Sequence, residues 1–133
     1  MRTSRPRTLV LVAAAGAAAL ALPASAQPLP DGAVNIVSGP QGSATNYLTT
    51  RVVSTTGTTV SFLNLDTTTH DVTSRATKTI VVKKKKKAVP LFHAPITAAG
   101  AATPVTGTEA LKPGAYDFFC TLHPGMTGTL TVQ

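Results

Sequence analysis

Cysteine is the scarcest reactive residue of this 133-residue chain, which contains only Cys120. An internal disulfide needs two cysteines, and so does a binuclear metal centre bridged by thiolates, so the sequence excludes both. Cys120 must therefore be a buried passenger, an intermolecular link, a reactive thiol or a metal ligand. The residues around it have to decide among these roles.

Acidic residues are also few, with five against 12 basic ones and a formal net charge of +7. Three of the basic residues stand at the extreme N-terminus, and five form the single run Lys83–Lys87. Without that run, the chain after residue 26 would be nearly neutral. The basicity is therefore local, and it does not predict a nucleic-acid-binding surface.

No apolar run is long enough to span a bilayer. The longest, residues 9–22, has 14 residues, whereas a hydrocarbon core needs roughly 20. Arg2, Arg5 and Arg7 lie close to its N-terminal side, and the small residues Ala24-Ser25-Ala26 follow it. This layout predicts a secretory signal peptide over residues 1–26 and a single domain over 27–133. We therefore expect export to the periplasm, the cell envelope or the outside, with membrane contact only through the leader.

A sustained helical period is absent after residue 26. Short apolar runs alternate with turn residues instead, as in residues 33–37, 47–53, 58–65, 79–82, 116–120 and 127–132. In residues 58–65 the alternation places Val60, Phe62 and Asn64 on one face. Alanines gather near residues 98–102, but Gly100 and the neighbouring threonines make that stretch a poor helix. Many short strands in about a hundred residues predict an all-β sandwich or barrel.

The strand before Cys120 places Tyr116, Phe118 and the thiol on one face, directed into the core. A tight loop follows, with His123 and Met126 at three-residue intervals from Cys120. Thiolate and thioether are soft donors suited to Cu(I), and imidazole serves both copper oxidation states. The loop therefore predicts a copper site.

A fourth ligand has two candidates, His70 and His93. His70 follows an alternating strand, whereas His93 lies between prolines in a loop-like stretch, so we favour His70. Met126 could instead be core filler, although its place directly after Pro124-Gly125 argues for ligation. Zinc would require more cysteine or histidine ligands and does not use methionine.

These residues carry a resemblance to a known family. The pattern is Gly114-x-Tyr116-x-Phe118-x-Cys120-x-x-His123-Pro124-x-Met126. It resembles the C-terminal signature of cupredoxins, and its short ligand loop is most similar to that of amicyanins. The motifs cover residues 60–72 and 113–132, and the strand pattern covers most of the predicted domain. The resemblance implies a Greek-key β-sandwich with one type 1 copper, with His70, Cys120 and His123 as equatorial ligands and Met126 as the axial ligand.

Two features depart from that family pattern. Cupredoxins often have asparagine directly after the first ligand histidine, where this chain has Asp71. An aspartate can still accept a hydrogen bond from the cysteine loop, but its charge near copper should favour Cu(II) and lower the reduction potential. The second departure, Lys83–Lys87, is either a solvated loop or edge that blocks aggregation, or a docking surface for an acidic partner or an anionic envelope polymer.

The function that follows is electron transfer, one electron at a time, between donor and acceptor proteins through Cu(I) and Cu(II). We expect a monomer and no enzyme activity, because the sequence offers no open metal position and no general base. The alternative is copper storage or delivery in the cell envelope. Delivery sites tend to be exposed clusters of methionine or histidine, and this chain has two methionines, one of them Met1.

Overall fold

The computed structural model describes residues 34–40 and 46–133, and the predicted leader and domain start lie outside these ranges. Ten strands and one short 3-10 helix make up the described part, which contains no α-helix. The strands are β1 Val34–Ser38, β2 Arg51–Ser54, β3 Val60–Asn64, β4 His70–Ser74, β5 Thr77–Val82, β6 Lys85–Pro90, β7 His93–Thr97, β8 Ala102–Val105, β9 Gly114–Phe119 and β10 Thr127–Val132, and the 3-10 helix η1 is Thr108–Ala110. The all-β prediction is confirmed.

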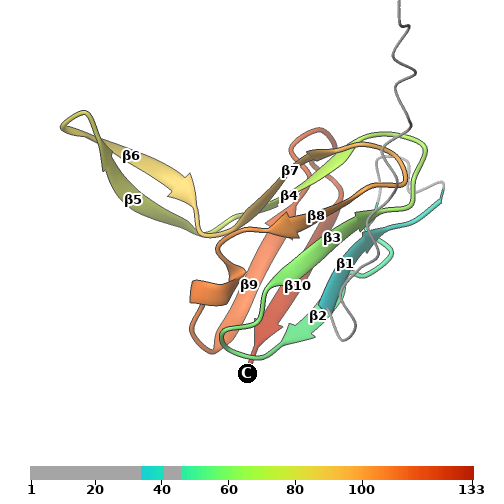
Figure 1. Cartoon of the computed structure of the whole chain (residues 1–133), viewed down its shortest axis with the longest axis horizontal. Coiled ribbons are helices and arrows are strands. Elements are labelled where there is room, and N and C mark those ends of the chain that lie inside the picture. The colour runs from blue at the N-terminus through green and yellow to red at the C-terminus, as the bar shows by residue number, and fades with distance from the viewer. Residues whose placement is uncertain (1–33, 41–45) are drawn as a thin grey trace, which may run out of the picture.

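Two sheets face each other to form the sandwich (Figure 1). The smaller sheet has the order β1-β3-β8, and the larger has the order β2-β10-β9-β4-β7. In the larger sheet β9 and β10 form a hairpin, β4 joins the free side of β9, and β2 runs parallel to β10. This order gives the predicted Greek-key sandwich of the cupredoxin type. It also places the starts of β4 and of the β9–β10 loop at the same end of the molecule.

The core lies between the sheets and follows the predicted alternation. In β3, Val60, Phe62 and Asn64 are buried while Ser61 and Leu63 are only half-buried. From the larger sheet, Phe118, Leu130 and Val132 are buried against them. Cys120 and Met126 belong to the same buried cluster, so the predicted copper loop is anchored directly in the core.

Tyr47 and Tyr116 differ from the sequence-based expectation. Residues 47–53 were predicted as a strand, but β2 begins only at Arg51, so Tyr47 precedes the strand. The Tyr47 ring is buried and lies edge-on to Phe118, with 5.1 Å between the ring centroids. Tyr116 was predicted to point inward with Phe118. It is half-buried at the rim of the core, where its hydroxyl donates to the Lys112 carbonyl oxygen.

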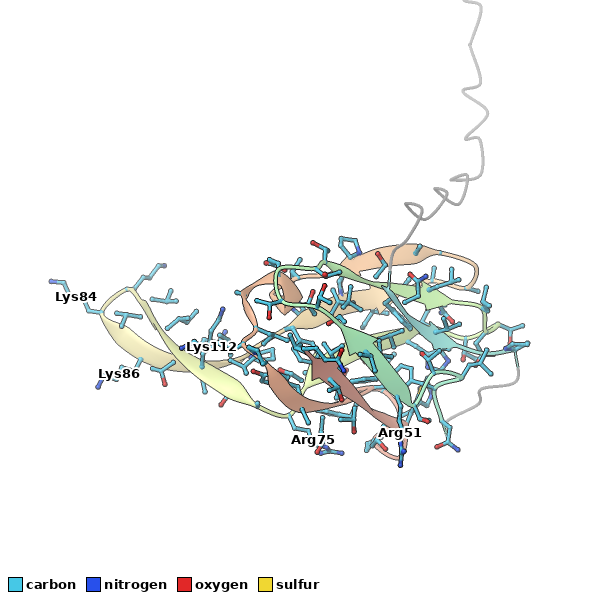
Figure 2. All side chains as sticks on the ribbon, turned by 90° about the horizontal axis from the view of Figure 1, so that it is seen from below. Arg51, Arg75, Lys84, Lys86 and Lys112 are labelled. Carbon is cyan, nitrogen blue, oxygen red and sulfur yellow. The ribbon has the colours of Figure 1, made fainter. Side chains whose placement is uncertain are left out.

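β5 and β6 form a hairpin with a sheet of their own, which projects from the sandwich (Figures 1 and 2). The lysine run lies at its tip: Lys83 and Lys84 make the turn, and Lys85–Lys87 begin β6. No hairpin residue belongs to the buried core cluster of the described residues. The run was predicted to be a loop or a strand edge. In the structure its first two residues form a turn, and the other three begin an edge strand.

Candidate metal centre

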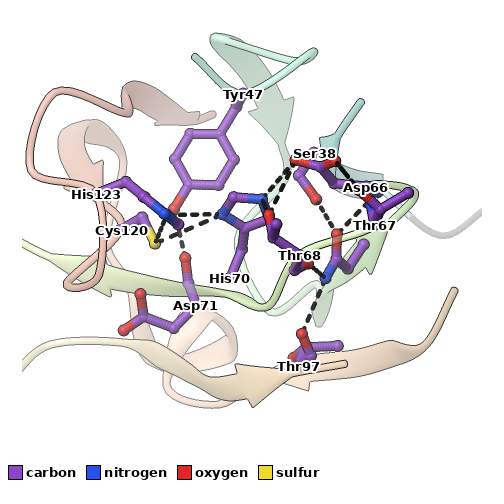
Figure 3. Close-up of polar contacts among 11 residues, drawn as sticks. Ser38, Tyr47, Asp66, Thr67, Thr68, His70, Asp71, Thr97, Cys120 and His123 are labelled. Carbon is purple, nitrogen blue, oxygen red and sulfur yellow. Dashed lines mark hydrogen bonds and ion pairs between the residues drawn. The ribbon is translucent and has the colours of Figure 1, made fainter. Parts of the chain in front are cut away.

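Three of the four predicted ligands meet at one end of the sandwich. His70 opens β4, and Cys120 and His123 lie on the loop that follows β9 (Figure 3). Their donor atoms, the Cys120 Sγ and one ring nitrogen from each histidine, lie within 4.8 Å of one another. Among the described residues this is the group of histidine, cysteine and acidic side chains placed to hold a metal ion.

The distances within the group describe a narrow triangle. Cys120 Sγ is 3.9 Å from His70 Nδ1 and 3.7 Å from His123 Nδ1, and the two Nδ1 atoms are 3.1 Å apart. Metal bonds to imidazole nitrogen and thiolate sulfur are about 2.0–2.3 Å long, so donors that share one ion are expected at about these separations. The donor set therefore fits a single bound metal ion.

Backbone hydrogen bonds shape the loop that carries Cys120, His123 and Met126. The His123 amide donates to the Cys120 carbonyl oxygen at 3.3 Å, and the Met126 amide donates to the His123 carbonyl oxygen at 2.8 Å. The Cys120 amide closes the loop by donating to the Met126 carbonyl oxygen at 3.0 Å. The three-residue spacing seen in the sequence thus corresponds to two successive tight turns, which bring all three residues to the same end.

Cys120 is fully buried, and this burial raises the pKa of its thiol. A buried thiol disfavours the charged form because it has lost contact with water. The thiolate is nevertheless the form that ligates metal, so metal binding must displace the thiol proton.

His70 is oriented by a residue that the sequence did not single out. Its Nε2 lies 2.8 Å from Asp66 Oδ2, and both side chains are buried. This hydrogen bond lowers the pKa of Asp66, so the carboxylate is ionised and accepts while Nε2–H donates. The proton on Nε2 leaves the Nδ1 lone pair free to face Cys120 and His123, the orientation that a metal ligand needs.

Asn64 holds the β3–β4 connection that carries Asp66. Its side-chain oxygen accepts from the Ser38 hydroxyl and the Asp66 amide, and its nitrogen donates to the carbonyl oxygens of Thr68 and Thr97. A buried asparagine with all these bonds fixes the backbone around it. Asp66 and Asn64 were missed because their role depends on the path of this connection. The available signal was an aspartate four residues before a histidine.

Asp71 connects β4 to the cysteine loop, as expected of the asparagine it replaces. Its carboxylate accepts from the Thr121 amide at 2.6 Å and from the Thr121 hydroxyl at 2.8 Å. The Tyr47 hydroxyl donates to the Asp71 carbonyl oxygen, and burial raises the pKa of Tyr47, so the phenol stays protonated. The first half of the interpretation of Asp71, a hydrogen bond to the loop, is therefore confirmed.

His93 and Met126 are the two remaining residues that the sequence offered as ligands. His93 is exposed on β7, where its backbone pairs with Thr106, and it does not join the His70–Cys120–His123 group. Met126 is fully buried at the end of the ligand loop. Ligation by His70, Cys120, His123 and Met126 stays a prediction, since the structure supplies only the placement of these side chains.

Comparison with known proteins identifies the family. The model of copper binding proteins of the plastocyanin/azurin family matches residues 34–133. The chain therefore belongs to the plastocyanin/azurin family of copper binding proteins. The family and the donor group together support the prediction of one type 1 copper per chain. Sequence comparison with curated proteins gives no match.

Among solved structures, the chain is similar to amicyanins. The amicyanin of Paracoccus versutus (Thiobacillus versutus) is 25% identical with a TM-score of 0.56, over 79% of this chain and 85% of that one. The reduced Cu(I) form, at pH 4, of a proline-to-glycine variant of amicyanin is 26% identical with a TM-score of 0.55, over 79% of this chain and 86% of that one. The predicted likeness to amicyanins is thus confirmed.

Proposed function

We propose that this protein is a single-electron carrier in which His70, Cys120 and His123 bind one copper ion as equatorial ligands and Met126 binds it as the axial ligand. The observation that carries the proposal is the triangle of Cys120 Sγ and the two histidine Nδ1 atoms. Copper, when bound, would supply a one-electron couple between Cu(I) and Cu(II).

The protein's contribution is a set of donors that stay in place. Asp66 fixes the His70 ring, and Asp71 ties β4 to the cysteine loop. The loop itself is closed by its own backbone hydrogen bonds and anchored in the core by Cys120 and Met126. Such a frame resists rearrangement when charge changes at the site, which favours fast transfer.

Electrons would enter or leave through His123. This histidine is half-buried, whereas His70 and Cys120 are fully buried. Leu122 beside it is 44% exposed, and Pro124 is exposed as well. We propose that redox donor and acceptor proteins contact this apolar rim, as predicted from the sequence.

Export and the absence of enzyme activity belong to the same proposal. Residues 1–26, with a basic head and a short apolar run, support a signal peptide and a periplasmic or envelope location. Within the described part of the chain, no helix has the length and hydrophobicity needed to span a bilayer. A copper ion held by four side chains would leave no open position for a substrate, which favours a carrier over an enzyme.

The test is repeated reduction and oxidation of the copper-loaded protein by voltammetry, with the copper content measured after each cycle. A carrier gives a reversible one-electron wave and keeps one copper per chain. Loss of copper to a Cu(I) chelator on each reduction would instead support the alternative, storage or delivery in the cell envelope.

A further inference from the structure

The β5–β6 hairpin concentrates the positive charge of the molecule. Lys78 and Lys83–Lys87 are on it, whereas the rest of the described chain has three basic and four acidic residues. No acidic residue occurs between Asp71 and Glu109. In the described residues no hairpin lysine has an ion-pair partner. The hairpin is therefore an uncompensated cationic arm on an otherwise nearly neutral domain.

Apolar side chains are interleaved with those lysines and face solvent. Val81 is 69% exposed and Val82 is 47% exposed, next to the turn. Across the hairpin Val82 pairs with Lys85, and Ile80 pairs with Lys87. Protection of an edge strand against aggregation requires the lysines but does not explain the exposed valines beside the turn. These valines do not belong to the buried core cluster, so packing does not explain them either.

The two turn positions are occupied by lysine although their backbone conformation favours other residues. Lys83 and Lys84 have φ values of 48° and 63°, in the left-handed region where asparagine and glycine are preferred in two-residue hairpin turns. L-residues other than these adopt that conformation at a conformational cost. The chain thus has lysine at two positions where backbone preference calls for other residues.

The arm lies apart from the proposed copper site. β4 starts at His70, and the hairpin follows its other end, after Ser74. Its six-residue strands extend about 20 Å from there. Figures 1 and 2 show the hairpin projecting away from the sandwich, and Figure 2 shows Lys84 and Lys86 near its outer end. A surface that held the tip would leave the His123 end free for a redox partner.

We propose that the β5–β6 hairpin docks this protein on an anionic lipid surface. Clustered lysines are attracted to acidic headgroups, and lysine stems can extend along apolar surface while their amines reach the phosphates. Val81 and Val82 would enter the headgroup boundary, and this apolar contribution favours a lipid surface over a hydrophilic polyanion or an acidic protein. The proposal does not depend on copper, and it extends the expected membrane contact beyond the leader.

The test is sedimentation of residues 27–133 with vesicles of phosphatidylcholine, with and without phosphatidylglycerol, at low and moderate salt. We expect binding only to vesicles with phosphatidylglycerol, weakened by salt. Lys83→Asn/Lys84→Gly removes two charges while improving the turn, so it should lower the partition coefficient about 25-fold, at about fivefold per lysine. Arg51→Gln/Lys112→Gln removes two charges from the sandwich and serves as the control that should bind almost normally.

Val81→Ser/Val82→Ser separates lipid from other anions because it keeps every charge. On a lipid surface it should weaken vesicle binding several-fold and leave retention on a polyglutamate column unchanged. Equal vesicle binding by this variant would overturn the proposal in favour of an acidic polymer or partner. No binding of the parent protein to anionic vesicles would overturn it in favour of a solvated edge. Either outcome leaves the copper proposal intact, since copper cycling is measured separately.

Discussion

Asp66 and His70 form a buried pair in which the carboxylate Oδ2 lies 2.8 Å from the ring Nε2. The pair places an anion on the side of the imidazole away from Cys120 and His123. It therefore decides which ring nitrogen faces the proposed copper ion, and it adds negative charge close to the site.

Replacing Asp66 by asparagine should raise the reduction potential and weaken Cu(II) binding. The amide oxygen can still accept from Nε2, but the charge that favours Cu(II) is gone. We expect about 10-fold weaker Cu(II) binding, which at unchanged Cu(I) binding corresponds to a rise of about 60 mV, measured by chelator competition and voltammetry. Asp117→Asn removes the same charge from an exposed carboxylate on β9 and should leave both quantities nearly unchanged. Equal effects in the two variants would show that Asp66 has no special role.

The copper-free protein should lose stability in acid partly through Asp66. The hydrogen bond from His70 lowers the pKa of Asp66 below its ordinary value near 3.8, so the unfolded state binds more protons around that pH. The stabilisation is complete above the unfolded value and disappears as pH falls through the folded value. As the pH is lowered from about 5 to about 2, the urea midpoint of unfolding should fall less steeply in Asp66→Asn than in the parent. Parallel curves would contradict the assignment.

Asp71→Asn, which restores the residue common in cupredoxins, should also raise the potential. The new side chain can still accept from the Thr121 amide, but the charge near the site is lost. Thr121→Val is the matched variant, because it removes the hydroxyl bond to Asp71 and keeps the carboxylate. We expect it to change the potential less than Asp71→Asn does. The reverse order would mean that loop geometry, rather than charge, sets the effect.

Gly128→Ala should destabilise the domain without removing the site. A Cβ at Gly128 would collide with the ring of Phe118, which is fully buried. Overpacking of this kind costs about 1–3 kcal/mol, seen as a lower midpoint of urea unfolding. Phe118→Leu provides room, so the double variant should lose less than the sum of the two single losses. Strict additivity would show that the two residues do not interact.

The alternation of single strands allowed much of the fold to be predicted. Val60, Phe62 and Asn64 were predicted to share one face, and all three are buried; Phe118 was predicted inside and is fully buried. Cys120 was predicted at the end of a strand, and β9 ends at Phe119, one residue before it. Such residues follow the two-residue period of one strand, which is visible without knowledge of the pairing.

What depends on pairing between distant segments was not predictable in this way. β6 begins within the lysine run, which has no strand-like pattern of its own and is paired by β5. Asp66 meets His70 through the β3–β4 connection, whose backbone is hydrogen-bonded to the Asn64 side chain at Asp66 and Thr68. Tyr47 was expected on a strand, but it lies before β2, and its ring packs against Phe118.

A visible absorption spectrum of residues 27–133 titrated with Cu(II) tests the proposed copper site most directly. We expect an intense thiolate-to-copper band that saturates at one copper per chain. The band should be absent from Cys120→Ser, lost or shifted in His70→Ala, and unchanged in His93→Ala, whose histidine lies on β7 outside the donor group. A well-folded protein without that band, or one in which His93→Ala rather than His70→Ala removes it, would contradict the proposed copper site.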